Sequence, residues 1–137
     1  MALKPQTIGK EMPHGFAGSY ARQPDMIVQT RPVGGTAGTT ADIPFGAALM
    51  YDSNGNAVLF GGTGTTAAKF VGVAGREIKS ALTYMDQSTG AYAVGEACNV
   101  FQRGSINVKC QKGTAKMGGD VYARIAVTDA TPSAIVG

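Results

Sequence analysis

The chain has few of the side chains from which proteins build catalytic or metal sites. Its 137 residues include one histidine, two cysteines and no tryptophan, and only 15% are charged, against about 25% in an ordinary soluble domain. Two cysteines and a single histidine are too few for a structural zinc site. His14 lies between Pro13 and Gly15 without an adjacent carboxylate, which makes it a poor general base. We therefore expect no enzyme activity, no metal and no cofactor.

Long apolar runs are also missing. No segment approaches the about 18 consecutive apolar residues of a membrane-spanning helix, and residues 1–7 lack the apolar stretch of an export signal. We expect that the protein does not associate with a membrane. We also expect that it is made in a cytoplasm, where Cys98 and Cys110 stay reduced. The net charge of +3 is mild, and the one basic cluster, at residues 109–116, has no aromatic platform for bases. We interpret that cluster as a solvated loop and expect no specific nucleic-acid partner.

Glycine, by contrast, is abundant. The chain has 20 glycines, about twice the usual share, and they follow no fixed period. This favours many turns and bulges, and the length suits one domain with a single core. The predicted fold class is mainly β: a single small β-barrel or sandwich-like domain with an extended N-terminal arm and at most one short helix, over residues 75–85 if that segment is not extended.

Residues 1–26 are predicted to form the extended arm, and residues 27–137 the β-rich domain. Prolines and glycines recur through the arm, so no long helix or regular strand is expected there. Apolar residues are nevertheless scattered along it: Met12, Phe16, Tyr20 and Met26. A disordered tail is one interpretation. The apolar content favours an arm that orders against its own subunit or a neighbour.

Strands are expected at residues 26–30, 43–51, 57–60, 70–74, 91–94 and 121–127. The Asn54-Gly55 dipeptide predicts a tight turn between the second and third of these, because both residues tolerate positive φ. Residues 61–66 are glycine-rich but lack the Gly-Lys-Ser/Thr of a phosphate-binding loop, so we expect a surface loop. Glu96 and Asp120 each follow a glycine and precede an expected strand, where we expect them to cap backbone amides.

Residues 95–110 are predicted to form a β-hairpin. Apolar side chains alternate with a period of two on both sides of Arg103-Gly104-Ser105. A three-residue loop there sets Cys98 opposite Cys110 and Val100 opposite Val108, whereas a two-residue turn would oppose apolar to polar residues.

Several short segments, in their order and spacing, carry a resemblance to a known family. They are Phe16-Ala-Gly18 with Pro24-Asp25, Ile43-Pro-Phe-Gly46, Phe70-Val-Gly-Val-Ala74, Tyr92 with Gly95-Glu96, Gly104-Ser-Ile-Asn-Val108, and Gly119-Asp-Val-Tyr122. With them the chain resembles the structural cement, or capsid decoration, proteins of tailed bacteriophages over roughly residues 15–125.

The resemblance implies a small β-rich viral structural protein that binds the outer surface of the capsid. Its partners would be the major capsid protein, whose neighbouring subunits it bridges to stabilise the head, and further copies of itself, with a trimer favoured over a dimer. It would be made in the host cytoplasm and located in the virion. The residues expected at the capsid or subunit interface are those of the arm: Met12, His14, Phe16, Tyr20, Arg22 and Met26.

Two alternatives belong to other classes. A phage tail or baseplate domain, or an adhesin-like binding module, would have a similar length and a similar β-rich sequence. A small trimeric enzyme such as a dUTPase-like pyrophosphatase would need an acidic metal-chelating loop and a phosphate-binding Gly-Ser pair. The sequence shows neither in that arrangement.

Overall fold

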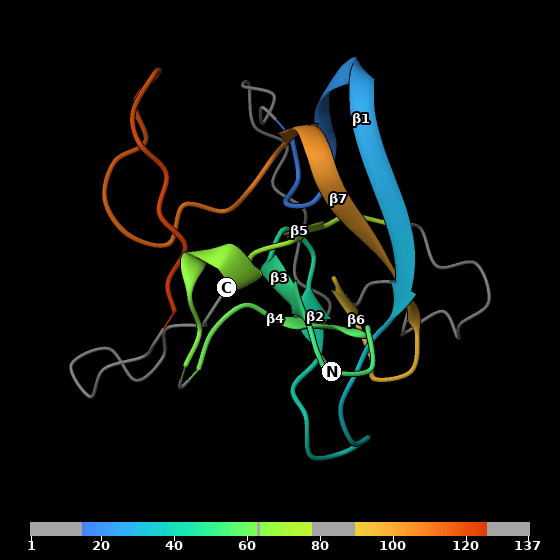
Figure 1. Ribbon diagram of the computed structural model, residues 1–137. Coiled ribbons are helices and arrows are strands. Elements are labelled where there is room, and N and C mark those ends of the chain that lie inside the picture. Colours follow the sequence, from blue (N-terminus) through green and yellow to red (C-terminus); the bar gives the residue numbers. More distant parts are fainter. Residues whose placement is uncertain (1–14, 63, 78–89, 126–137) are drawn as a thin grey trace, which may run out of the picture.

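Two antiparallel sheets make up the computed structural model, which describes residues 15–62, 64–77 and 90–125 (Figure 1). The larger sheet has the strand order β1-β7-β5-β3-β4, and the smaller one pairs β2 with β6. The strands are β1 (Tyr20–Pro32), β2 (Ile43–Pro44), β3 (Ala48–Tyr51), β4 (Ala57–Leu59), β5 (Gly72–Ala74), β6 (Ala91–Tyr92) and β7 (Ala97–Ile106). One 3₁₀ turn, η1 (Ala67–Lys69), is the only helix among the described residues. The predicted mainly β class is confirmed, although the described sheet is open and not a closed barrel.

The longest strand, β1, forms one edge of the larger sheet and pairs with β7 toward both of its ends, from Tyr20 opposite Ile106 to Pro32 opposite Ala97, with register shifts between them. It begins at Tyr20, earlier than the sequence predicts from its prolines. The register shifts between Arg22 and Ile27, and a bulge on an edge strand does not need a ladder hydrogen bond from every residue. The division of the chain into an arm and a domain at residue 26 stays a prediction.

The predicted hairpin at residues 95–110 is wrong. Strand β7 continues through Arg103-Gly104-Ser105, and its partner is β1, with Phe101 opposite Val28 and Cys98 opposite Arg31. Gly104 makes no turn. A Cβ placed on it would lie 3.0 Å from the Asp25 carbonyl oxygen, so the glycine permits a close approach of two strands. As a result Cys98 is buried and Cys110 is exposed, and no disulfide joins these two described cysteines.

The expected strand over residues 43–51 is split into β2 and β3. Gly46, at φ +81°, turns the chain between them, so β2 pairs with β6 and β3 pairs with β4 and β5. The turn predicted at Asn54-Gly55 is confirmed, because β3 and β4 pair across it with Tyr51 opposite Ala57. The expected strand at residues 70–74 is found as β5, and the one at 91–94 as the shorter β6.

The core combines residues of both sheets, with Ile43 and Tyr92 contributed by β2 and β6 of the smaller one. It consists of Val33, Ile43, Ala47, Leu49, Ala57, Ala74, Tyr92, Cys98 and Val100. The buried Tyr92 donates a hydrogen bond from its hydroxyl to the Gly75 carbonyl oxygen at 2.5 Å, and burial raises the pKa of this phenol. An isolated parallel bridge between Val33 and Ala57 joins the two edges of the larger sheet at one end.

The last expected strand, at residues 121–127, is not formed within the described residues 121–125. This part of the chain is exposed, and its Ile125 carbonyl oxygen accepts a hydrogen bond from the Gly62 amide at 2.8 Å. A strand needs a neighbour to pair with, and in the described part of the molecule no strand pairs with this segment. The one short helix that the sequence allows, over residues 75–85, lies mostly outside the described residues.

Candidate interaction surface

Exposed large apolar side chains are concentrated in two segments. Eleven such residues are described, and all but Phe70 lie in residues 16–28 or 108–125. The first group contains Phe16, Tyr20, Met26, Ile27 and Val28, and the second contains Val108, Met117, Val121, Tyr122 and Ile125. Apolar surface that gathers in this way is typical of sites that bind other proteins.

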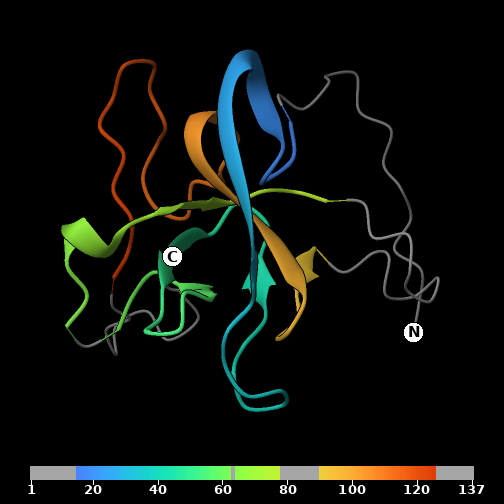
Figure 2. The ribbon, with the colours of Figure 1, turned by 45° about the vertical axis from the view of Figure 1, so that its right-hand side comes forward.

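The second group lies on residues 107–125, which we call the excursion. It leaves the end of β7 and stands apart from the two sheets (Figure 2), and beyond Ile106 no helix or strand is assigned to its described residues. Gly113 and Gly118 have φ of +87° and +73° and allow its bends. Lys109, Lys112 and Lys116 are exposed on it, as the prediction of a solvated basic loop requires.

The first group begins where the chain is fixed to the sheet. The Gly18 amide donates to the Asn107 carbonyl oxygen at 2.8 Å, and the Arg76 amide donates to the Gly18 carbonyl oxygen at 2.7 Å. The Ser19 hydroxyl donates to the Phe16 carbonyl oxygen at 2.7 Å and closes a turn. The chain therefore enters β1 from an anchored point at residues 16–19.

The residues predicted for the interface are distributed along this segment. The Phe16 ring is 61% exposed and lies 4.8 Å from the Arg76 guanidinium, and the Tyr20 ring lies 5.7 Å from that of Phe101. Arg22 is exposed in β1, as is Met26. The other two, Met12 and His14, lie outside the described residues.

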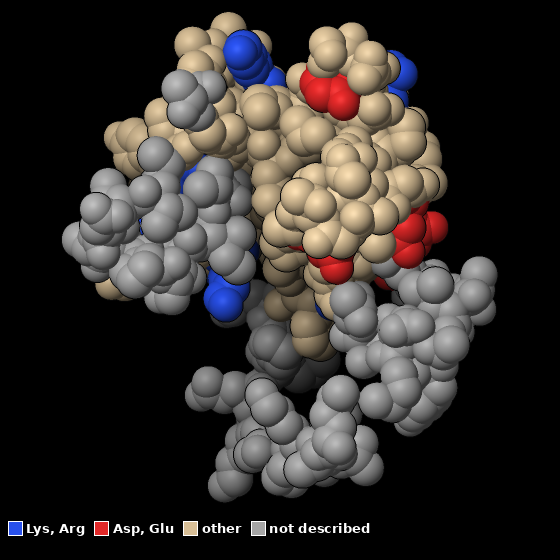
Figure 3. Space-filling view, turned by 90° about the horizontal axis from the view of Figure 1, so that it is seen from below, with Lys and Arg blue, Asp and Glu red and all other residues tan. Residues whose placement is uncertain are grey.

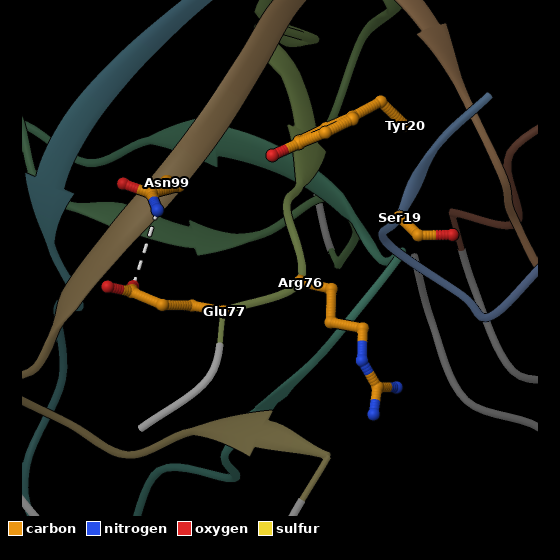
Figure 4. A pocket seen from close by; sticks show the side chains of 5 residues that line it. All are labelled: Ser19, Tyr20, Arg76, Glu77 and Asn99. Atoms are coloured by element: carbon orange, nitrogen blue, oxygen red, sulfur yellow. Dashed lines mark hydrogen bonds between the residues drawn. The ribbon is translucent and has the colours of Figure 1, made fainter. Parts of the chain in front are cut away.

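Beside this segment is a shallow hollow lined by side chains of mixed charge (Figure 4). Its lining residues are Ser19, Tyr20, Arg76, Glu77 and Asn99. The Asn99 side-chain amide donates to Glu77 at 3.3 Å, while the Arg76 guanidinium points away from this pair toward Phe16. The hollow is thus lined by one carboxylate, one guanidinium and one aromatic ring.

A second polar cluster joins β1, β3 and β7. The Tyr51 hydroxyl donates to the Gln29 side-chain oxygen at 3.2 Å and accepts from the Gln102 side-chain amide at 3.3 Å. The Arg31 guanidinium lies over the Tyr51 ring, 5.4 Å from its centre. These contacts fix exposed side chains on the sheet next to the β1 edge.

The sequence assigned backbone-capping roles to two carboxylates. Glu96 accepts a hydrogen bond from the Ala93 amide at 2.7 Å, which confirms the prediction for this residue. Asp120 lies in the exposed excursion, away from any described strand, so the strand entry expected there is wrong.

Within the described ranges, no group of three or more His, Cys, Asp or Glu is placed to hold a metal ion, and no helix is long and apolar enough to cross a membrane.

One face of the molecule is seen in Figure 3, from below the view of Figure 1, and only its described residues are considered. Figure 3 shows this face as mostly uncharged surface with separate acidic and basic side chains.

The exposed apolar side chains of the excursion could not be found from the sequence, because the pattern of residues 121–127 predicts a paired strand. The flanking Gly113, Gly118 and Gly119 are the one signal that favours an irregular segment.

A small open β-sheet with exposed apolar side chains on two extended segments is typical of proteins that bind others through their surface. The chain belongs to a phage structural protein family, because the family model of the structural cement protein (E217 gp24/Pam3 gp6) matches residues 5–137. Membership implies association with the phage capsid in the virion and a non-enzymatic role. No curated protein and no solved structure gives a significant match.

Proposed function

We propose that the protein is a cement protein that binds the outer surface of the phage capsid and bridges neighbouring major capsid protein subunits. It acts as a homo-oligomer, a trimer rather than a dimer, and is assembled onto heads in the host cytoplasm. The observation that carries the proposal is the placement of exposed apolar side chains on β1 and on the excursion, in a member of the cement family.

Bridging follows from the separation of the two segments. β1 forms one edge of the sheet, and the excursion lies on the other side of the molecule (Figure 1), so one molecule can contact two neighbours at once. Each fully buried large apolar side chain contributes about 1.5–3 kcal/mol, and a stable interface buries about 800 Å² on each partner. Internal pressure would have to break these added contacts before two capsid subunits could part.

The predicted arm extends the same surface. Four of the predicted interface residues lie at or after the anchored residues 16–19: Phe16, Tyr20, Arg22 and Met26. The other two, Met12 and His14, precede them in the chain. We propose that these six residues contact the capsid or a neighbouring copy. Their side chains combine apolar area with three polar groups, on His14, Tyr20 and Arg22, that can form hydrogen bonds at the rim of an interface.

The test uses heads that lack this protein. Purified protein added to such heads should bind at a saturable number of sites, appear by cryo-electron microscopy on the outer surface across subunit boundaries, and raise the temperature at which the heads open. An unrelated small β protein of similar charge serves as the control. Density on the tail or baseplate would instead support the binding-module alternative, and an unchanged opening temperature at full occupancy would contradict cementing.

A further inference from the structure

The outer edge of β1 is a strand edge without a described neighbour. β1 ends the order of the five-stranded sheet and has 13 residues, and the Val33–Ala57 bridge lies beyond its end. Met26, Ile27 and Val28 on this strand are 37%, 50% and 38% exposed. A long edge with apolar side chains is a template for pairing with another chain.

The excursion contains a segment that lacks a partner strand in the described part of the molecule. Residues 119–125 have the composition of a strand but pair with none among the described residues. Val121 and Tyr122 are 85% and 86% exposed. Leaving two such side chains in water is unfavourable, and pairing as a strand against an apolar edge would cover part of both.

Within one molecule the two segments lie apart. β1 forms one edge of the sheet, at the right of Figure 1, and residues 119–125 lie in the excursion at the left. We propose that residues 119–125 of one copy pair as an added strand with the outer edge of β1 of a second copy. This inference rests on the homo-oligomer of the proposed function and names its interface. Because each copy then uses two different surfaces, the contact is head-to-tail, which forms a ring when the rotation between successive copies closes on itself.

Charge complementarity favours an antiparallel pairing in a particular register. With Arg124 opposite Asp25, Tyr122 lies opposite Ile27, and Asp120 lies opposite Gln29, diagonal to Arg31. Opposite charges that face each other, directly or diagonally, stabilise paired strands. A parallel pairing with Arg124 opposite Asp25 would place Asp120 opposite Ala21, out of reach of Arg31. Asp25 is accessible for this contact, since its exposed carboxylate binds Arg103 through one oxygen, Oδ2, at 3.2 Å.

The first experiment removes one backbone donor from the added strand. Tyr122→Pro should abolish pairing without disturbing the sheet, because residue 122 belongs to no described strand. Thr114→Pro, in the same excursion but outside residues 119–125, is the matched control. Light scattering after size-exclusion chromatography should give oligomers for the wild type and for Thr114→Pro, and at least a tenfold weaker self-association for Tyr122→Pro. Far-UV circular dichroism checks that each variant is folded.

A charge exchange then tests the register. Asp25→Arg and Arg124→Asp should each weaken self-association, and the double variant should regain most of it. Equal oligomers for Tyr122→Pro and the wild type, no recovery in the double variant, or a monomeric wild type would overturn the pairing. Binding to heads is measured separately. A wild-type monomer that still decorates heads would overturn only the pairing, and an oligomer that pairs as proposed but does not bind heads would overturn only the proposed function.

Discussion

At the scale of single residues, Asp52 organises the turn between β3 and β4. Its Oδ1 accepts hydrogen bonds from the amides of Asn54 and Asn56 at 2.8 and 2.9 Å, and its Oδ2 accepts one from the Asn56 side chain at 3.0 Å. Donation from the Asn56 amide is the main reason that the pKa of this carboxyl is lowered. The ionised form therefore stabilises the turn.

The lowered pKa predicts how stability depends on pH. Because the folded pKa lies below the unfolded one, the contribution of Asp52 is complete above about pH 4 and is lost as the pH falls through the folded value. Asp52→Asn should melt at a lower temperature than the wild type at pH 7, and the difference should shrink toward pH 2. Thermal melts of both proteins across this range make the test. A difference that stays constant with pH would show that the charge of Asp52 has no role.

The two cysteines occupy opposite environments, so their thiols should react at different rates. Cys98 is fully buried in the core, whereas Cys110 is exposed in the excursion. We expect one thiol per chain to react quickly with an aromatic disulfide reagent in the native protein, and the second only after unfolding. Cys110→Ser should remove the fast phase and Cys98→Ser should leave it. Two fast thiols in the native protein would contradict the burial of Cys98.

At the scale of elements, glycines allow β5 and β7 to approach closely. A Cβ on Gly72 would overlap the Phe101 carbonyl oxygen, and one on Gly75 would lie 2.5 Å from the Phe101 ring. Neither glycine has a positive φ, so their role is to leave space. As a result, Phe101 is only 7% exposed.

A methyl group at this contact should separate the two strands. Gly72→Ala is expected to lower the free energy of unfolding by about 1–3 kcal/mol, the usual cost of overpacking. Gly90→Ala is the matched control, because its Cβ would meet only the Phe45 ring at 3.9 Å and should change stability by no more than about 0.5 kcal/mol. Urea denaturation measures both. Equal stabilities of the two variants would mean that β5 and β7 can shift apart at no cost.

Local signals predicted local structure, whereas long-range pairing had no signal in the sequence. Asn54-Gly55 predicted its turn because the conformations of both residues are set by neighbours in the chain. The partner of β7 could not be predicted, since a strand pattern does not say which strand it pairs with. Gly104 favoured a turn, but it serves a close approach to Met26. The arm residues Phe16 and Tyr20 could be selected because apolar side chains among prolines stand out, whereas Val121 and Tyr122 matched an ordinary strand.

At the scale of the whole molecule, low charge and exposed apolar area have a common explanation. Only 15% of the residues are charged, so electrostatic repulsion between free copies of the protein is weak. Assembly on a particle covers apolar surface and removes the need for such repulsion. The molecule is thus suited to being one part of a larger assembly, and its extended segments should contribute more to that assembly than to its own fold.

The N-terminal residues provide the clearest test of this division of roles. Deleting residues 2–14 removes only chain that precedes the anchored residues 16–19, so the sheet should stay folded with a nearly unchanged melting temperature. If Met12 alone is buried on a partner, its loss costs about 1.5–3 kcal/mol, which weakens retention on heads about 10- to 100-fold. A variant with residues 2–14 replaced by a Gly/Ser segment of equal length separates side-chain contacts from chain length. Co-sedimentation with heads measures retention. Full retention of both variants would show that residues 2–14 make no contact with the capsid, and a large fall in melting temperature would assign these residues to the core instead.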